Sequence, residues 1–302
     1  DAPGSQIEAL YQTLAGDGLV AGDGARACAS ESGRAPCWIP PRACPDGTRG
    51  AACFRRGAMP VIFLATGTDF HEGPPDDTSS APWSTYAGLV PAPHGFAELV
   101  STFNAGASRV VGLNLGAAVH CEGARAARVP GEACYDLLSV ARASRTIDRN
   151  GAPVLLDLPA SATPVAIHDT LTRAAQSIAR DVPFDVTTAL RTDASNPPMV
   201  DASRFVRART PSCQVGTPNE RCWTPPTGVP AASAVARTDI NALYRVVPGT
   251  RARITVTFRN DNVFEGADHL SVFHLTLDAL GDGALVDSRE LYLVVPRTQG
   301  VN

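Results

Sequence analysis

The chain has 302 residues, of which 44% are hydrophobic and 19% charged, and its formal net charge is -4. This length allows one large domain or two ordinary domains with cores of their own, and the composition excludes a disordered chain. All 26 basic residues are arginines that are scattered along the chain, so the sequence does not indicate a nucleic-acid-binding surface. No apolar run approaches the roughly 20 residues that a membrane-spanning helix needs, and we expect no membrane span.

The eight cysteines fall into four local pairs, which are Cys28 with Cys37, Cys44 with Cys53, Cys121 with Cys134, and Cys213 with Cys222. An even number of clustered cysteines favours an oxidising compartment, so we predict disulfides between sequence neighbours and a secreted or cell-surface protein. Zinc is an alternative, but no CxxC occurs, and structural zinc sites usually have ligands about two to four residues apart. A single catalytic thiol is a further alternative, although it would leave an odd cysteine.

The first 180 residues or so alternate between helical and strand patterns. Apolar residues at helical spacing predict helices over 6–15, 96–103 and 136–146, and Thr163 with Pro164 opens another helix. We expect Ile167, Leu171, Ala174 and Ile178 to form the buried stripe of that helix. Continuous apolar runs predict strands over 60–66, 109–115 and 153–158 that are covered on both faces. Strands that alternate with helices indicate a doubly wound parallel sheet, and residues 17–59, with four cysteines, are interpreted as an inserted loop.

Beyond Val182 the apolar period changes from helical to two, beginning at Phe184. We therefore place a domain boundary between residues 183 and 184. Segments over 251–259, 270–277 and 290–295 are predicted strands, separated by turn signals such as Gly281-Asp282-Gly283. They predict an antiparallel β-sandwich over residues 184–302, in which no helix is needed.

Two stretches resemble motifs of a known family. The opening residues 1–12, DAPGSQIEALYQ, resemble the DAPEGGFDA motif that leads from a metal-binding loop into a helix in the A domains of integrin β chains. Residues 61–71, VIFLATGTDFH, resemble the strand and loop LLVFTTDAGFH of the same domains. With the order of strands and helices, these motifs make residues 1–183 similar to the C-terminal part of a von Willebrand factor A-like domain of a bacterial surface protein. The resemblance implies an incomplete doubly wound sheet, followed here by the β-sandwich.

The resemblance also implies a divalent-cation site at the carboxyl ends of the strands, where oxygen ligands would hold Mg²⁺ or Ca²⁺. Asp1 and Asp69 are the candidate ligands in this chain. Gly4 and Gly67 stand where the family has acidic ligands, and the family's DxSxS loop is absent. We therefore expect a degenerate site without a tightly held metal and no other cofactor.

In this family the strand that carries DxSxS is central in the sheet and pairs with the strand that corresponds to residues 61–66. Its absence leaves an apolar strand edge open, and open edges pair with other chains. We expect a protein partner, a second chain or an upstream segment to complete the sheet.

These features favour a non-enzymatic adhesion or protein-interaction module that binds through the loops over 67–82 and 120–134. The candidate binding residues are Asp69, Phe70, His71, Glu72 and Trp83. The alternative is a structural component of a cell-surface assembly whose edge pairing is itself the function. A third hypothesis is a secreted hydrolase or zinc site that uses His71, Glu72 or Asp69 with His94, Asp76 and Asp77, but the HExxH spacing is missing.

Overall fold

The computed structural model describes residues 6–19, 39–55, 57–70, 93–115, 121, 133–158, 161–197, 200–211, 223–230, 234–261, 263–264 and 269–296. The chain divides into two compact units, Asp1–Val182 and Pro183–Asn302. The division falls one residue before the expected boundary.

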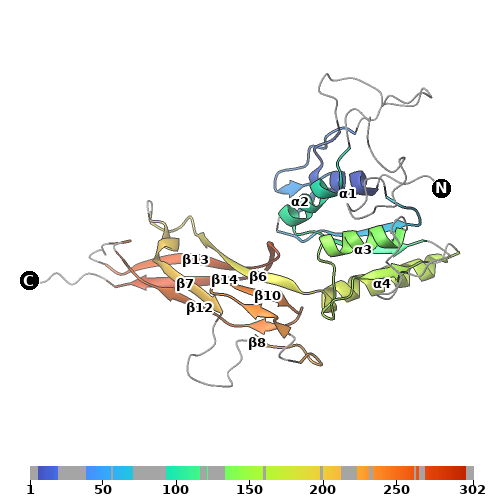
Figure 1. Cartoon of the computed structure of the whole chain (residues 1–302). Helices are drawn as coiled ribbons and strands as arrows, with labels where there is room; N and C mark the ends of the chain where they lie inside the picture. Colours follow the sequence, from blue (N-terminus) through green and yellow to red (C-terminus); the bar gives the residue numbers. More distant parts are fainter. Residues whose placement is uncertain are drawn as a thin grey trace, which may run out of the picture. The chain divides into compact units, whose positions relative to one another are not determined.

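The first unit is a mixed α/β structure (Figure 1). Its elements are α1 (Gln6–Ala15), β1 (Thr48–Arg49), β2 (Phe54–Arg55), β3 (Val61–Thr66), α2 (Phe96–Gly106), β4 (Arg109–Asn114), α3 (Ala133–Ala143), β5 (Leu155–Asp157) and α4 (Pro164–Asp181). The helices and strands expected from the apolar periodicity are all present, with ends that differ by a few residues.

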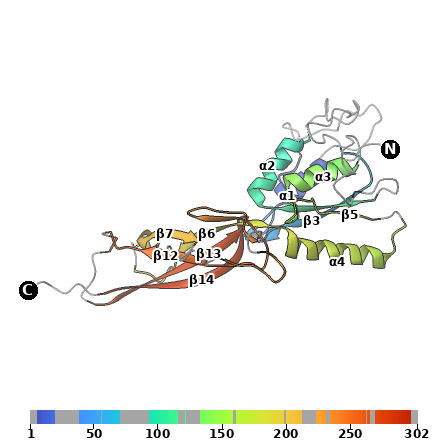
Figure 2. The same cartoon turned by 60° about the horizontal axis from the view of Figure 1, so that its bottom comes forward.

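Three parallel strands form the centre of this unit, in the order β3-β4-β5. Figure 2 shows α4 on one side of these strands and α1, α2 and α3 on the other. Because alternate residues of a strand point to opposite faces, β4 supplies Val110 to one core and Val111 and Leu113 to the other. Helices therefore cover both faces of the central strand β4, in which every residue is buried.

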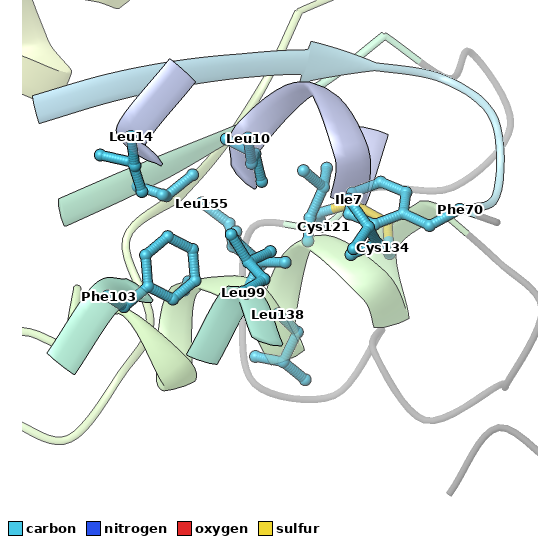
Figure 3. Packing of buried hydrophobic residues seen from close by; sticks show 14 residues of the cluster. Ile7, Leu10, Leu14, Phe70, Leu99, Phe103, Cys121, Cys134, Leu138 and Leu155 are labelled. Atoms are coloured by element: carbon cyan, nitrogen blue, oxygen red, sulfur yellow. A yellow bond between two sulfur atoms is a disulfide. The ribbon is translucent and has the colours of Figure 1, made fainter. Parts of the chain in front are cut away.

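The larger core lies between the sheet and the three helices α1, α2 and α3 (Figure 3). Apolar side chains at helical spacing meet there, among them Ile7, Leu10 and Leu14 of α1 and Leu99 and Phe103 of α2. The Cys121–Cys134 disulfide lies in the same core.

Helix α4 starts as the sequence predicts. Thr163 is the N-cap and accepts a hydrogen bond from the Ala166 N–H, and Pro164 occupies the first turn. Ala174 and Ile178 are buried as expected, but Ile167 is 40% exposed. The expected buried stripe is therefore wrong at Ile167, because the first turns of α4 have no described neighbour that covers this side chain.

The second unit contains antiparallel sheets. Its elements are β6 (Phe184–Thr192), the short 3-10 helix η2 (Ala202–Phe205), β7 (Val206–Pro211), β8 (Trp223–Thr224), β9 (Arg237–Thr238), β10 (Ala242–Val246), β11 (Arg251–Ala252), β12 (Ile254–Phe258), β13 (Ser271–Gly281) and β14 (Ala284–Val295). Five strands form one sheet in the order β14-β13-β6-β10-β9, while β12 pairs with β7 and β11 with β8. The hairpin between β13 and β14 turns at Asp282 and Gly283, both with positive φ, where the sequence predicts a turn.

Helix η2 corrects the expectation that this half has no helix. Its residues Ala202 and Phe205 are fully buried against Phe273 and Leu275 of β13, and Phe258 of β12 packs on the same cluster. Phe205 lies 4.9 Å from Phe273, ring centre to ring centre. The turn of helix therefore fills the space between the large sheet and the β7–β12 pair.

Candidate functional site

The carboxyl ends of the parallel strands carry polar residues, as expected for the site-bearing edge of such a sheet. Asn114 ends β4 and Asp157 ends β5. The Asn114 Nδ2 group donates to Asp157 Oδ1 over 2.9 Å, and the Cys121 N–H donates to the same oxygen over 2.8 Å. Asp157 therefore holds the backbone of a disulfide-bonded residue beside the end of β4.

The loop that follows β3 is held in a comparable way. The Gln6 Nε2 group donates to Thr66 Oγ1 over 2.9 Å and lies 3.3 Å from Thr68 Oγ1. Asp136 of α3 is 1% exposed, and its Oδ2 accepts the Phe70 N–H over 2.8 Å. The carboxylates of Asp136 and Asp157 at this edge thus hold backbone N–H groups, a role that stabilises loops.

Of the expected binding and metal-ligating residues, the structure describes Asp69 and Phe70. Asp1, His71, Glu72 and Trp83 lie outside the described residues. Asp69 is half-buried. Phe70 is 2% exposed and belongs to the larger core, so its ring packs internally and does not form part of an exposed binding surface. Within the described ranges, no three His, Cys, Asp or Glu side chains are grouped so that they could hold a metal.

Two of the four expected disulfides are formed. Cys44 is bonded to Cys53, and Cys121 to Cys134, with Cα–Cα distances of 5.4 and 5.5 Å. Cys28, Cys37, Cys213 and Cys222 lie outside the described residues. Disulfides between sequence neighbours are typical of proteins that fold in an oxidising compartment. None of the described helices has both the length and the apolar character needed to cross a bilayer.

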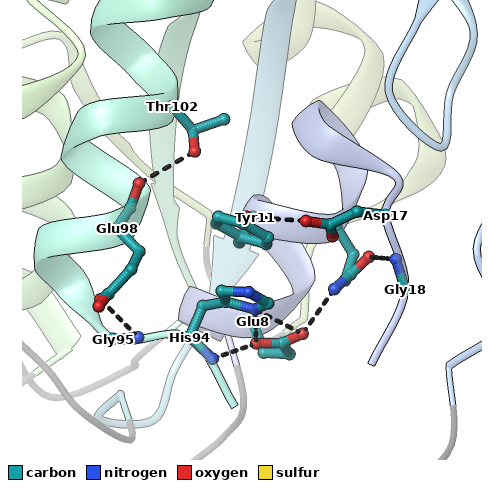
Figure 4. Close-up of polar contacts among 9 residues, drawn as sticks. Glu8, Tyr11, Asp17, Gly18, His94, Gly95, Glu98 and Thr102 are labelled. Atoms are coloured by element: carbon teal, nitrogen blue, oxygen red, sulfur yellow. Dashed lines mark hydrogen bonds and ion pairs between the residues drawn. The ribbon is translucent and has the colours of Figure 1, made fainter. Parts of the chain in front are cut away.

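His94, a member of the hydrolase hypothesis, contacts Glu8 of α1 (Figure 4). Glu8 is 4% exposed, and its Oε2 accepts the His94 N–H over 2.6 Å and lies 3.0 Å from His94 Nδ1. The Gln12 Nε2 group donates to the other carboxylate oxygen over 2.8 Å. Asp76 and Asp77 lie outside the described residues. Glu8 therefore connects α1 to the start of α2, which begins two residues after His94.

Tyr11 extends this cluster. Its ring stacks on the His94 ring with 3.5 Å between centres, and its hydroxyl donates to Asp17 Oδ2 over 3.0 Å. The pKa of Tyr11 is raised from 10.0 to about 12. Partial burial is the largest cause, and the hydrogen bond to Asp17 and the negative charges nearby add to it. Tyr11 thus stays a neutral donor at physiological pH, which suits a structural contact between α1 and the loops around it.

The outer edge of β3 has no strand beside it in the described part of the chain. β3 pairs with β4 alone, since the sheet order is β3-β4-β5. The carbonyls of Pro60 and Thr66 accept N–H groups of Arg109 and Leu115. Because successive residues of a strand point their N–H and C=O groups in opposite directions, even-numbered residues face β4 and odd-numbered residues face outward. The outward set comprises Val61, Phe63 and Ala65.

One face of β3 is also partly exposed. Phe63 and Ala65 pair in register with Val111 and Leu113 of β4, so they point to the same face of the sheet, toward the α4 side. Val111 is 0% and Leu113 3% exposed, whereas Phe63 is 37% exposed and Ala65 is also exposed. The expectation that residues 60–66 are covered on both faces is therefore wrong at Phe63 and Ala65, because the core on the α4 side packs against Val61 of β3 but leaves these two residues exposed. We call the outward backbone groups of β3 together with Phe63 and Ala65 the open β3 surface.

The sequence predicts the open edge of β3 but not the exposure of Phe63 and Ala65 on one face. The residues of β3 resemble those of β4, because both are apolar runs, and burial on one face depends on a neighbouring element that no local pattern encodes. The Glu8–His94 contact was missed as well, since the two residues are 86 positions apart.

No protein-family model matches the chain, and no curated protein sequence is significantly similar to it.

Proposed function

We propose that this chain is a secreted or cell-surface protein-interaction module that binds a strand of another polypeptide along the outer edge of β3. The observation that carries the proposal is the open β3 surface, on which Phe63 is 37% exposed beside the fully buried Val111. A strand added at this edge would pair with the N–H and C=O groups of Val61, Phe63 and Ala65. The chain that supplies the strand would cover Phe63.

The chemistry of β3 supports this proposal because the strand lacks the usual protection of an edge. Natural edge strands are shortened, charged, interrupted by proline or bulged. β3 has six residues, VIFLAT, without a charge or a proline, and its register with β4 is continuous. An apolar edge of this kind is suited to recognition by strand addition.

Two other edge strands of the described sheets, β5 and β14, differ from β3. β5, at the far edge of the parallel sheet, has three residues and ends in Asp157. β14, at one edge of the five-stranded sheet, is long but carries the exposed charges Asp287, Arg289 and Glu290. The lack of protection is thus particular to β3 among these three edge strands.

The proposal agrees with a von Willebrand factor A-like origin of the first unit, in which the partner would supply the missing part of the sheet. That origin is itself a proposal, supported by the parallel strands with helices on both faces and by the motifs at residues 1–12 and 61–71. The two disulfides support an extracellular location. We propose no enzymatic activity and no resident metal for the module.

Amide hydrogen exchange of the full chain, resolved by residue, tests the proposal. The probe is a short synthetic peptide of alternating valine and threonine with lysines at its ends, added to a dilute solution of the chain. We expect the peptide to slow exchange at Phe63 and Ala65, whose N–H groups point outward. Leu64, which faces β4, should be slow with or without the peptide.

Two controls make the result specific. The variant Phe63→Lys places a charge on the bare face and should weaken the protection of Ala65 by the peptide at least tenfold. The outward amides of β14, beside Arg289 and Glu290, should keep their rates. If saturating peptide leaves Phe63 and Ala65 unchanged, β3 does not accept a strand and the proposed function is wrong.

A further inference from the structure

We infer that the strand which β3 accepts is β3 of a second copy of this chain, antiparallel to it, with Phe63 on the twofold axis. This inference rests on the proposed function, because it names the partner of the same surface. It predicts a continuous six-stranded sheet in the order β5-β4-β3-β3-β4-β5, in which the second half belongs to the partner copy.

The register follows from which groups point outward. The N–H and C=O groups of odd-numbered residues face the open edge, so only odd-numbered residues can form the hydrogen-bonded pairs of an antiparallel ladder. Pairing Phe63 with its own copy brings Val61 opposite Ala65 on both sides of the axis. This register uses all three outward residues of β3, and a shift by two residues leaves one of them outside the strand.

The side chains agree with this register. Residues that lie opposite each other in an antiparallel pair share a face, and Val61, Phe63 and Ala65 all share the α4 side of the sheet. A twofold axis normal to the sheet keeps the α4 sides of both copies on the same face. The two exposed Phe63 rings therefore become neighbours, and the bare faces of the two copies join.

Charge favours a second copy over a partner that recognises charges. No residue of β3 is charged, so an identical strand meets no like-charge repulsion at this edge. The surface also offers no charge by which a foreign strand could be selected. Any foreign partner would be chosen by apolar contact and backbone pairing alone, which the chain's own β3 provides equally well.

Sedimentation of the full chain over a wide concentration range gives the first test, since association responds to concentration by mass action. We expect a reversible equilibrium between monomer and dimer. In the variant Phe63→Lys two charges would meet on the axis, and we expect this variant to stay monomeric at all concentrations while circular dichroism shows that it is folded.

A disulfide across the axis tests the register. In a hydrogen-bonded antiparallel pair the two Cα atoms are about 5.5 Å apart, which suits a disulfide. The variant Phe63→Cys should therefore form a covalent dimer under mild oxidation. Cleavage after arginine releases residues 57–109, which contain no native cysteine, so a linked pair of these peptides identifies the bond.

Ala65→Cys is the matched control. Residue 65 lies on the same strand and face, but in this register it is opposite Val61 of the other copy. The Cα atoms of the two introduced cysteines would be roughly 13 Å apart, too far for a disulfide. We expect at least tenfold less covalent dimer than with Phe63→Cys.

The outcomes separate the two proposals. A chain that stays monomeric at every concentration, while the valine–threonine peptide still protects Phe63 and Ala65, overturns the second-copy inference and leaves the proposed function in place. Equal or stronger cross-linking at position 65 also overturns it. A monomeric chain that the peptide does not protect contradicts both.

Discussion

Phe63 of β3 and Val111 of β4 are paired in register on one face of the parallel sheet, and they differ in burial: Val111 is 0% exposed and Phe63 37%. The two positions share strand geometry, face and apolar character. They differ in that Ala174 and Ile178 of α4 share a core with Val111, whereas Phe63 lies outside that core. This difference allows the contribution of the covering helix to be measured by comparing substitutions at the two positions.

We expect Val111→Ala to lower the free energy of unfolding of the first unit by roughly 1–3 kcal/mol, because it removes buried methyl groups and leaves a cavity. Phe63→Thr should cost less than about 1 kcal/mol in the monomer, since Phe63 is already 37% exposed and threonine suits a strand. Both losses of unfolding free energy are measured by urea unfolding at a protein concentration where the chain is monomeric. Hydrogen exchange of the β4 amides monitors the unfolding. A larger loss at position 63 would show that Phe63 is covered in solution.

Gly112 of β4 marks a close approach between the sheet and α3. A Cβ at this position would lie 2.5 Å from Leu155 Cδ2 and 3.0 Å from Leu137 Cβ. We expect Gly112→Ala to destabilise the first unit by about 1–3 kcal/mol through overpacking. In the double variant with Leu155→Ala, the added methyl would occupy space that the leucine vacates. The double variant should therefore lose less stability than the sum of the single variants, and simple additivity would contradict the contact.

The two disulfides should differ in what their removal costs. Replacing Cys121 and Cys134 by alanine should cost about 2–4 kcal/mol from the loss of the cross-link, with a further loss because both residues lie in the larger core. Cys44 and Cys53 close a loop of similar length outside that core. We therefore expect the smaller loss from the Cys44→Ala/Cys53→Ala variant. Urea midpoints of the two double variants decide the order, and a larger loss at Cys44 and Cys53 would contradict it.

The sequence was sufficient for those features that a local pattern encodes. Helical periodicity located α1, and Thr163 with Pro164 marked the start of α4, because a cap and a first turn are set by neighbouring residues. The apolar runs located β3 and β4. Neighbouring cysteines gave the correct partners for Cys44 and Cys121, since short loops close readily.

Features that depend on distant residues could not be read in this way. β7, Val206–Pro211, carries arginines at alternate positions and owes its strand conformation to pairing with β12, about 45 residues later. The carboxylate of Glu8 finds its partner at His94, and no motif joins the two. Phe63 looks like a core residue in sequence and is exposed because its neighbour on one face is absent from the described structure.

Tyr11 makes the contacts of the first unit sensitive to alkaline pH. Its pKa is raised from 10.0 to about 12 by partial burial and by the hydrogen bond to Asp17. Because the folded state holds the tyrosine proton more tightly than the unfolded state, the resulting stabilisation is fully present below pH 10. It is lost as the pH rises from about 10 through about 12, so the free energy of unfolding should fall over this range.

Ultraviolet titration of the tyrosinate signal tests this shift. The chain has five tyrosines, so the signal of Tyr11 is obtained by subtracting the titration of Tyr11→Phe from that of the unaltered chain. We expect the difference to titrate near pH 12. Asp17→Asn removes the charged acceptor and should move the transition toward 10, while the stability of Tyr11→Phe should depend less steeply on pH between 10 and 12. A difference signal that titrates near 10 in the unaltered chain would mean that Tyr11 is not held by Asp17 and His94 in solution.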